Sequence, residues 1–369
     1  MHDLEAMPKR LEAFLASVDG QRTATVHRYA LMTGGYSRVM ARADVQWSDG
    51  VAETLVLRGD PPPDKAMLIT DRDTEWAVLQ SLSSVASVPM PAARYYDSTG
   101  EHLTTKAIVL DFCAGPSMQS KLNELVASGV PVDDPQMIAH RDAFIDTLAA
   151  VPAVDVGLLP MALARPSSWE AYMSAVNQSW PEAEKAMVES SPIMRYLGAW
   201  LDAHRPPPMP LVLQHGDLQP ANILLDPTDG SHRLIDWEYA HIGDPREDLG
   251  WYVAYSAVAP PSLYGFDPEA FLARYREKTG AGELYVNQAT VGYFSVVSAV
   301  KVFSQIVQAA DSMGQGKTNG IMTTYNINAA INGHMNFMAA CAGLAEPIDA
   351  LRAMHEQLMA AAIPQGGAA

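Results

Sequence analysis

Cysteine is scarce in this 369-residue sequence, which contains only Cys113 and Cys341. Two cysteines so far apart in the chain exclude a disulfide framework and a cysteine-rich zinc site. The ten histidines do not have the HExxH spacing of a zinc hydrolase or a similar metal spacing. The sequence therefore indicates a soluble protein of the reducing cytoplasm.

Positively charged residues are also few. Lys and Arg number 25 against 42 Asp and Glu, which gives a formal net charge of −17. Such a surface repels the phosphate backbone of nucleic acids, so the sequence predicts no nucleic-acid partner. An acidic surface attracts cationic small molecules, but solubility alone explains the imbalance equally well.

Long, uninterrupted apolar runs are absent as well. The most apolar stretch, residues 291–310, carries Lys301, Gln305 and Gln308, so it predicts a buried helix rather than a membrane span. Residues 1–5 are acidic and lack the basic-then-apolar order of a secretory signal. We therefore expect no membrane partner, and nothing indicates an obligatory protein partner.

Hydrophobic residues make up 48% of the chain, enough for a substantial core, and the length fits two domains or one two-lobed unit. A helical pattern over 4–18 ends near Gly20, and a second covers 71–82. The Ser-Asp-Gly turn at 48–50 indicates antiparallel pairing of the strands around it. The predicted strands are 26–32, 39–47, 52–58, 93–96 and 107–112.

Beyond Gly115-Pro116 the patterns are mostly helical, except over 211–237, where short apolar runs flank a turn signal at 227–230. The sequence therefore predicts an α+β chain with a small antiparallel-sheet lobe over 1–112. A larger, mostly helical lobe is expected over 113–369, after a hinge near Gly115.

Three polar residues occur in the segment that interrupts the helices. Asp217 is followed by Asn222 and then by Asp236, and the predicted hairpin between the last two would bring their ends together. Phosphoryl transfer needs one carboxylate to orient the attacking hydroxyl and separate oxygens to hold magnesium against the phosphates. Each residue alone is explained equally well by a helix cap or a turn, so the argument depends on their joint spacing.

The motif His215-Gly216-Asp217, with Asn222 after four residues, and the motif Ile235-Asp236-Trp237-Glu238 resemble the catalytic loop and metal motif of the aminoglycoside phosphotransferase family. That family includes choline kinases and a domain fused to some acyl-CoA dehydrogenases, and residues 237–249 are similar to the continuation in that last branch. The resemblance implies a protein-kinase-like bilobal fold. It also implies an ATP- and Mg²⁺-dependent O-phosphotransferase that moves the γ-phosphoryl group to a hydroxyl of a small molecule.

The resemblance also implies roles for individual residues. Asp217 would be the catalytic base, Asn222 and Asp236 would be the magnesium ligands, and Asp248 would brace the catalytic loop. The glycine loop over the triphosphate would contain Gly34, Gly35 and Ser37, where the missing Cβ lets backbone N–H groups approach phosphate.

The remaining nucleotide-binding residues lie on the predicted strands, the helix and the hinge. Arg58 stands where a protein kinase has a lysine, and Glu75 would be its ion-pair partner. Lys65 is a poorer candidate for this cation. Asp111 and Cys113 belong to the hinge whose backbone would read the edge of adenine.

The acceptor is predicted to be a hydroxyl-bearing small molecule, because the segment between Asp236 and Asp248 is too short to present a peptide. A cationic aminoglycoside would need carboxylates, whereas a macrolide-like or hydroxyacyl acceptor would suit apolar, Met-rich helices. The candidate carboxylates are Asp244, Glu247 and Asp248, the aromatic candidates are Trp237, Tyr239, Trp251 and Tyr252, and the methionines are Met313, Met322, Met335 and Met338.

Two alternatives stay open. The chain would fit a catalytically silent, kinase-like module that binds a nucleotide or ligand and regulates a partner, although Asp217, Asn222 and Asp236 argue against this. It would also fit a hydroxyacyl kinase acting beside a separate acyl-CoA dehydrogenase chain, because no dehydrogenase-like segment is present.

Overall fold

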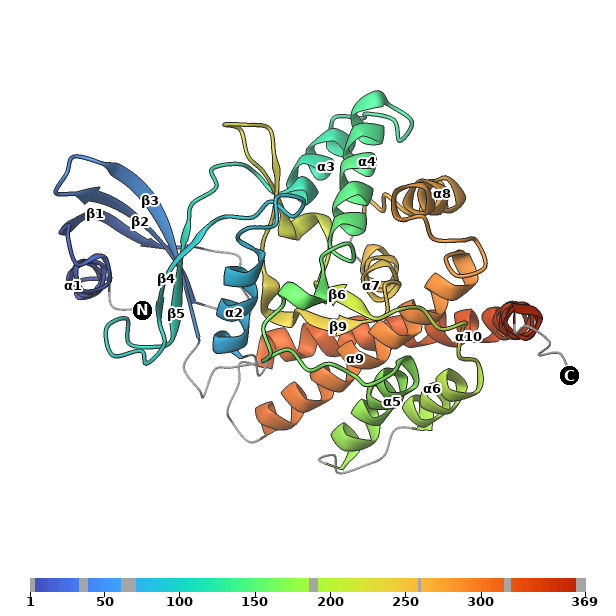
Figure 1. The fold of residues 1–369 in the computed structure, drawn as a ribbon. Helices are drawn as coiled ribbons and strands as arrows, with labels where there is room; N and C mark the ends of the chain where they lie inside the picture. The colour runs from blue at the N-terminus through green and yellow to red at the C-terminus, as the bar shows by residue number, and fades with distance from the viewer. Residues whose placement is uncertain are drawn as a thin grey trace, which may run out of the picture.

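The computed structural model of this chain describes residues 4–32, 39–60, 71–185, 192–257, 260–314 and 320–362. Gly34, Gly35, Ser37 and Lys65 lie outside the described residues, so their predicted roles are not addressed by the structure. The described chain forms a small sheet-containing lobe and a larger helical lobe (Figure 1), so the predicted α+β, bilobal, kinase-like fold is confirmed.

The small lobe is built on a five-stranded antiparallel sheet in the order β1-β2-β3-β5-β4. Its strands are β1 (Ala24–Leu31), β2 (Val39–Trp47), β3 (Ala52–Gly59), β4 (Ala93–Asp97) and β5 (Ala107–Asp111). The β2 and β3 strands pair from Val39↔Gly59 to Gln46↔Ala52, so the turn between them is the one predicted at 48–50. The predicted strands are therefore present, with ends that differ by at most two residues.

One face of this sheet is covered by α1 (Met7–Asp19), which ends at Gly20 in a left-handed conformation, as predicted. The helix and the sheet share an apolar cluster, to which α1 contributes Met7, Leu11, Phe14 and Leu15 and β2 contributes Ala41, Ala43, Val45 and Trp47. Because side chains alternate along a strand, the intervening residues of β2 lie on the opposite face. That second face carries the polar groups of the site described below.

Between the sheet and the helical lobe lies α2 (Arg72–Leu82), whose first turn is capped by the Asp71 side chain accepting from Asp73 N (Figure 1). Its buried residues Val78, Leu79 and Leu82 belong to the apolar cluster that fills the helical lobe. The division at 112/113 stays a prediction, since α2 packs into the core of the second lobe.

The helical lobe contains the long helices α9 (Gln288–Gly314) and α10 (Gly320–Ala362) and several shorter ones. The shorter helices are α3 (Met118–Ala127), α4 (Pro135–Ala150), η2 (Val156–Leu158), α5 (Trp169–Glu184), α6 (Pro192–Ala203), α7 (Glu247–Ser256) and α8 (Pro268–Thr279). The α7 and α10 helices both pack against α9. None of the helices in the described part of the chain has the length and apolar character needed to cross a bilayer.

Two small antiparallel sheets connect these helices to the site. The first pairs β6 (Val212–Gln214) with β9 (His241–Gly243), and the second pairs β7 (Ile223–Leu225) with β8 (His232–Leu234). Two short 3₁₀ helices lie in the predicted motifs. The first, η3 (Pro220–Asn222), ends at Asn222, and the second, η4 (Trp237–Tyr239), begins directly after Asp236. The predicted hairpin at 223–235 is thus confirmed, whereas β9 was not predicted.

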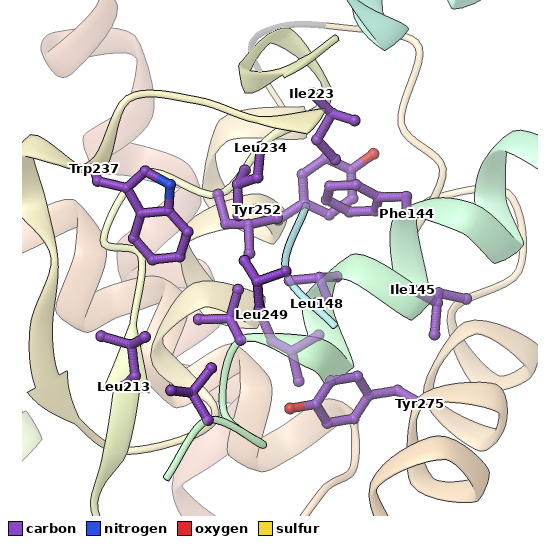
Figure 2. Packing of buried hydrophobic residues seen from close by; sticks show 14 of the residues in the cluster. Phe144, Ile145, Leu148, Leu213, Ile223, Leu234, Trp237, Leu249, Tyr252 and Tyr275 are labelled. Carbon is purple, nitrogen blue, oxygen red and sulfur yellow. The ribbon is translucent and has the colours of Figure 1, made fainter. Parts of the chain in front are cut away.

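The floor of the site is the main apolar core (Figure 2). Leu213, Ile223, Leu234 and Trp237 point into the same cluster as Phe144 and Tyr252. Trp237 and Tyr252 are each 1% exposed, so both belong to this core, which is the more common role of aromatic residues at such a spacing.

Candidate active site

The catalytic loop begins where β6 ends. Gly216 has φ +82°, and a Cβ there would lie 2.5 Å from Tyr239 O, so this position requires glycine. The N–H groups of His215 and Gly216 each donate to one oxygen of Asp248, both at 2.8 Å. The predicted brace of the loop by Asp248 is therefore confirmed.

The buried His215 ring ties the loop to the segment that carries the metal motif. Its Nδ1 accepts from Asp217 N at 3.2 Å, and its Nε2 lies 2.9 Å from Ile235 O. A carbonyl only accepts, so the ring is neutral with its proton on Nε2. Burial lowers the pKa of His215, which agrees with this tautomer.

Asp217 is partly buried and is held by amide groups. Asn222 Nδ2 donates to Asp217 Oδ2 at 2.9 Å, and Gln219 Nε2 donates to Asp217 Oδ1 at 2.7 Å. In the described part of the chain, no Lys or Arg forms an ion pair with this carboxylate. Burial and the charge of Asp236 raise the pKa of Asp217 to about 7, although hydrogen bonds from Asn222, Gln219 and Trp251 act in the opposite direction.

Asp236 follows β8 and lies beside Asn222. Ile235 N donates to Asn222 O at 2.9 Å, which joins the two predicted magnesium ligands through their backbones. Asp236 has φ 72° and ψ 60°, a left-handed conformation that is uncommon for a residue other than glycine. The fold thus holds this carboxylate at the site in an unfavourable backbone conformation.

The donor atoms of Asn222 and Asp236 fit magnesium. The Asn222 amide nitrogen is used by Asp217, which leaves its Oδ1 as the available oxygen, and Asp236 offers carboxylate oxygens. Magnesium prefers oxygen ligands and is held by one or two protein groups together with phosphates and water. Within the described residues there is no cluster of three or more His, Cys, Asp or Glu that could hold a metal ion.

Arg58 on β3 reaches from the small lobe into the helical lobe. Its Nη2 bonds Asp236 Oδ1 and lies 3.1 Å from Glu238 Oε2, while its Nε lies 3.2 Å from Glu75 Oε1. Burial lowers the pKa of Arg58, but Asp236, Glu75 and Glu238 outweigh it and hold that pKa above its usual value. The predicted pair of Arg58 and Glu75 is present, and its role toward a nucleotide stays a prediction.

A second arginine, Arg72, was missed from the sequence. Its Nη1 bonds the other oxygen of Glu75, and its Nη2 lies 2.9 Å from Asp60 Oδ1. Arg72 is 2% exposed, so it fixes Glu75 between two guanidinium groups. The signal that could have found it is its position three residues before Glu75 on the same predicted helix.

The backbone N–H groups of the predicted hinge residues differ in whether they are hydrogen-bonded within the protein. The N–H of Asp111 donates to Ala92 O at 2.9 Å, and that of Phe112 donates to Thr54 O at 3.2 Å. The Asp111 carboxylate lies 3.1 Å from Arg94. Burial raises the pKa of the Cys113 thiol. Since these two amides are engaged, Cys113 is the first predicted hinge residue with an N–H for the edge of a base.

The three carboxylates predicted as partners of a cationic acceptor are all engaged inside the protein. Asp244 pairs with Arg246 at 2.6 Å, and both side chains are fully buried. Asp248 accepts from the catalytic loop. Glu247 accepts from Tyr172, His241 and Lys301 and is 2% exposed. The contact of Lys301 was missed because that residue is far from Glu247 in the sequence.

Two of the other residues predicted to line the acceptor site lie at the surface of the described structure. Tyr239 and Trp251 are partly exposed, and Trp251 lies close enough to Asp217 to affect its pKa. The side chains of Met313, Met322, Met335 and Met338 lie outside the described part of the structure.

A two-lobed fold whose aspartate loop is braced by a second carboxylate, with an arginine reaching across from the small lobe, is typical of kinase-like phosphotransferases. A model of the phosphotransferase enzyme family APH matches residues 35–284, and the chain therefore belongs to this family. The mouse protein acyl-CoA dehydrogenase family member 10 is 26% identical over 212 residues, which are 56% of this chain but only 18% of that protein.

Solved structures of similar proteins agree on the fold. The ternary complex of aminoglycoside phosphotransferase APH(4)-Ia with ADP and hygromycin B has a TM-score of 0.60 at 14% identity and covers 90% of this chain and 98% of that one. A choline/ethanolamine kinase family protein from Mesorhizobium loti has a TM-score of 0.57 at 16% identity, covering 92% and 99%. A macrolide 2'-phosphotransferase from Brachybacterium faecium has a TM-score of 0.52 at 20% identity, covering 91% and 98%.

Proposed function

We propose that this chain moves the γ-phosphoryl group of ATP to a hydroxyl of a small molecule, with Mg²⁺ as the metal. The observation that carries the proposal is the Asp217 carboxylate, which accepts from Asn222 Nδ2 at 2.9 Å and whose pKa burial and the charge of Asp236 raise to about 7. A base that titrates near neutral pH takes up a proton efficiently and is still ionised in a useful fraction of molecules. Family membership supports the same reaction class.

In the proposed mechanism, Asp217 orients the acceptor hydroxyl and accepts its proton as the oxygen attacks the γ-phosphorus. Asn222 donates to one oxygen of the carboxylate and Gln219 to the other, which fixes the orientation of the carboxylate. Asn222 Oδ1 and Asp236 would hold Mg²⁺, which supplies positive charge against the phosphates when bound. Arg58, fixed by Glu75, would contact the phosphates from the small lobe.

The acceptor is proposed to be a hydroxyl compound without several positive charges, such as a macrolide-like or hydroxyacyl molecule. Asp244, Glu247 and Asp248 are all engaged by internal donors, so they offer nothing to an aminoglycoside's ammonium groups. Hygromycin B is bound by APH(4)-Ia, whose likeness to this chain concerns the fold. A hydroxyacyl acceptor fits the similarity to the mouse dehydrogenase relative.

One contact favours a second candidate function, a silent nucleotide-binding module. Arg58 bonds Asp236 Oδ1, one of the two oxygens that this carboxylate could offer a metal ion. If that pair persisted with nucleotide bound, Asp236 would be a weaker metal ligand and phosphoryl transfer would be impaired.

The test starts with calorimetry of ATP binding with and without Mg²⁺, on the wild type and on Asp236→Asn. We expect magnesium-dependent binding that weakens in Asp236→Asn and is unchanged in Asp229→Asn, a control carboxylate in the β7–β8 turn that pairs with Arg233. A panel of alcohols, including macrolides, aminoglycosides and hydroxyacyl thioesters, is then assayed for phosphorylated product by mass spectrometry. Magnesium-independent binding without any product would support the silent module instead.

A further inference from the structure

The face of the small-lobe sheet that looks toward Asp236 is defined by Arg58. On β3 the residues Leu55 and Leu57 join the cluster under α1, so Val56 and Arg58 lie on the other face. The pairing places Arg42 of β2 opposite Val56. Leu110 of β5 pairs with Val56 from the other side. Arg42, Val56 and Leu110 therefore form one row across this face, next to Arg58.

The guanidinium of Arg42 is stacked on the hinge. Its carbon Cζ lies 4.5 Å from the centroid of the Phe112 ring. Phe112 N donates to Thr54 O, so the ring is attached to the edge of β3. An arginine over an aromatic face is held by the ring quadrupole, and the opposite face of a guanidinium plane is one on which another flat group can stack.

The side chain of Arg42 is also held from behind. Its Nε and Nη2 lie 3.2 and 3.1 Å from Asp44 Oδ1, and Thr54 Oγ1 donates to the same oxygen at 2.9 Å. A cavity of about 310 Å³ adjoins Asp44 and Thr54, which hold Arg42, but neither Arg42 nor Phe112 lines it. The Arg42 side chain is 38% exposed, so the positioned guanidinium is accessible to solvent beside the hinge.

We propose that Arg42, stacked on Phe112, is the nucleobase-stacking residue of this protein and gives it a preference for purine over pyrimidine nucleotides. The inference rests on the proposed nucleotide site, since a triphosphate at Arg58 and Asp236 directs its base along this row toward the hinge. Stacking on a guanidinium plane depends on the area of the π system and tolerates different purines. ATP and GTP gain from it alike, whereas CTP and UTP gain less.

The test compares nucleotides with inorganic tripolyphosphate, a probe that has phosphates and no base. We expect Arg42→Ala to weaken binding of ATP and GTP by roughly tenfold, that of CTP and UTP by about two- to threefold, and that of tripolyphosphate by less than twofold. Arg42→Lys, which keeps the charge and loses the plane, should resemble Arg42→Ala. Titration calorimetry in the presence of Mg²⁺ gives the dissociation constants of all five ligands.

Arg22→Ala is the matched control, because Arg22 Cζ lies 4.1 Å over the Trp47 ring, on the face of the sheet that α1 covers. It should leave all the affinities unchanged. Equal losses for ATP and tripolyphosphate in Arg42→Ala would assign Arg42 to the phosphates and overturn the proposal, as would unchanged ATP binding. If the wild type binds tripolyphosphate as tightly as it binds every nucleotide, the base is not recognised and the proposal is overturned, whereas the phosphate site is supported. Failure to bind either probe overturns the proposed function itself.

Discussion

Two carboxylates that follow the strands of the small β6–β9 sheet, one buried and one partly buried, have opposite surroundings. Glu247, at the start of α7, accepts from the Lys301 ammonium, from His241 Nε2 at 2.9 Å and from the Tyr172 hydroxyl. Asp217, just after β6, is held by the amides of Asn222 and Gln219. One carboxylate faces cations, and the other faces neutral donors and a second carboxylate, Asp236.

The pKa values follow from these partners. Burial raises the pKa of Glu247, but His241 and Lys301 outweigh it and hold that pKa well below its usual range. Burial raises the pKa of Asp217 to about 7, and Asp236 adds to the effect. Burial alone does not decide the state of a carboxylate; its partners do, and they separate a structural ion pair from a group that exchanges protons near neutral pH.

The largest expected effect is on turnover. Asp217→Asn keeps the size of the side chain and removes the base, so we expect kcat to fall by about 10²–10⁴-fold while ATP affinity changes little. Steady-state kinetics on the best acceptor and calorimetry with ATP measure the two quantities. A kcat within tenfold of the wild type would mean that Asp217 is not the base.

The next effect is on folding. Glu247→Gln leaves Lys301 and His241 facing a neutral amide at a buried position, so we expect the free energy of unfolding to fall by about 3 kcal/mol. Urea denaturation measures it. Glu346→Gln, at an exposed position, is the control and should change stability by less than about 0.5 kcal/mol. A loss as small as the control's would show that the three donors do not depend on the charge of Glu247.

A third effect has the opposite sign and depends on pH. The pKa of Asp217 is about 7 in the folded protein and about 3.9 in an unfolded chain, so its ionisation favours unfolding. The stability present below pH 4 is therefore lost as the pH rises through 7. Without nucleotide or metal, the stability of Asp217→Asn relative to wild type should therefore rise by about 3 kcal/mol between pH 4.5 and pH 8. A pH-independent difference would contradict the raised pKa.

The smallest effect concerns one donor of the Glu247 cluster. Tyr172→Phe removes the hydroxyl that bonds Glu247 and leaves two donors in place, so we expect a loss of about 1 kcal/mol. Combining it with Glu247→Gln forms a double-mutant cycle, in which the coupling energy isolates this bond. Additive losses would mean that the hydroxyl acts independently of the carboxylate.

Local pattern was enough to predict much of this molecule. Alternation and turn residues predicted β2 and β3, and the spacing of Asp217, Asn222 and Asp236 predicted that they would meet. The Arg58–Glu75 pair was implied by the resemblance to kinase-like proteins, supported by its strand and helix context. These features depend on residues close in sequence or on a motif carried in one segment.

The features that the sequence did not predict depend on contacts between residues that are far apart in the chain. The β9 strand is three residues long and is identified only by its pairing with β6. Lys301 reaches Glu247 because α9 packs on α7, and no pattern near either residue encodes that packing. Arg42 and Phe112 meet through strand register, which alternation alone leaves undetermined.

The left-handed backbone of Asp236 has a consequence for selection. A residue with a Cβ costs on the order of 1 kcal/mol in this conformation, and glycine would remove the cost. Asp236→Gly would therefore relieve the backbone and at the same time remove the contact with the buried Arg58, so a screen for heat resistance alone sets these two effects against each other and does not select for the carboxylate itself. A library intended to make this protein more robust should keep codon 236 fixed, because the proposed mechanism needs the carboxylate there.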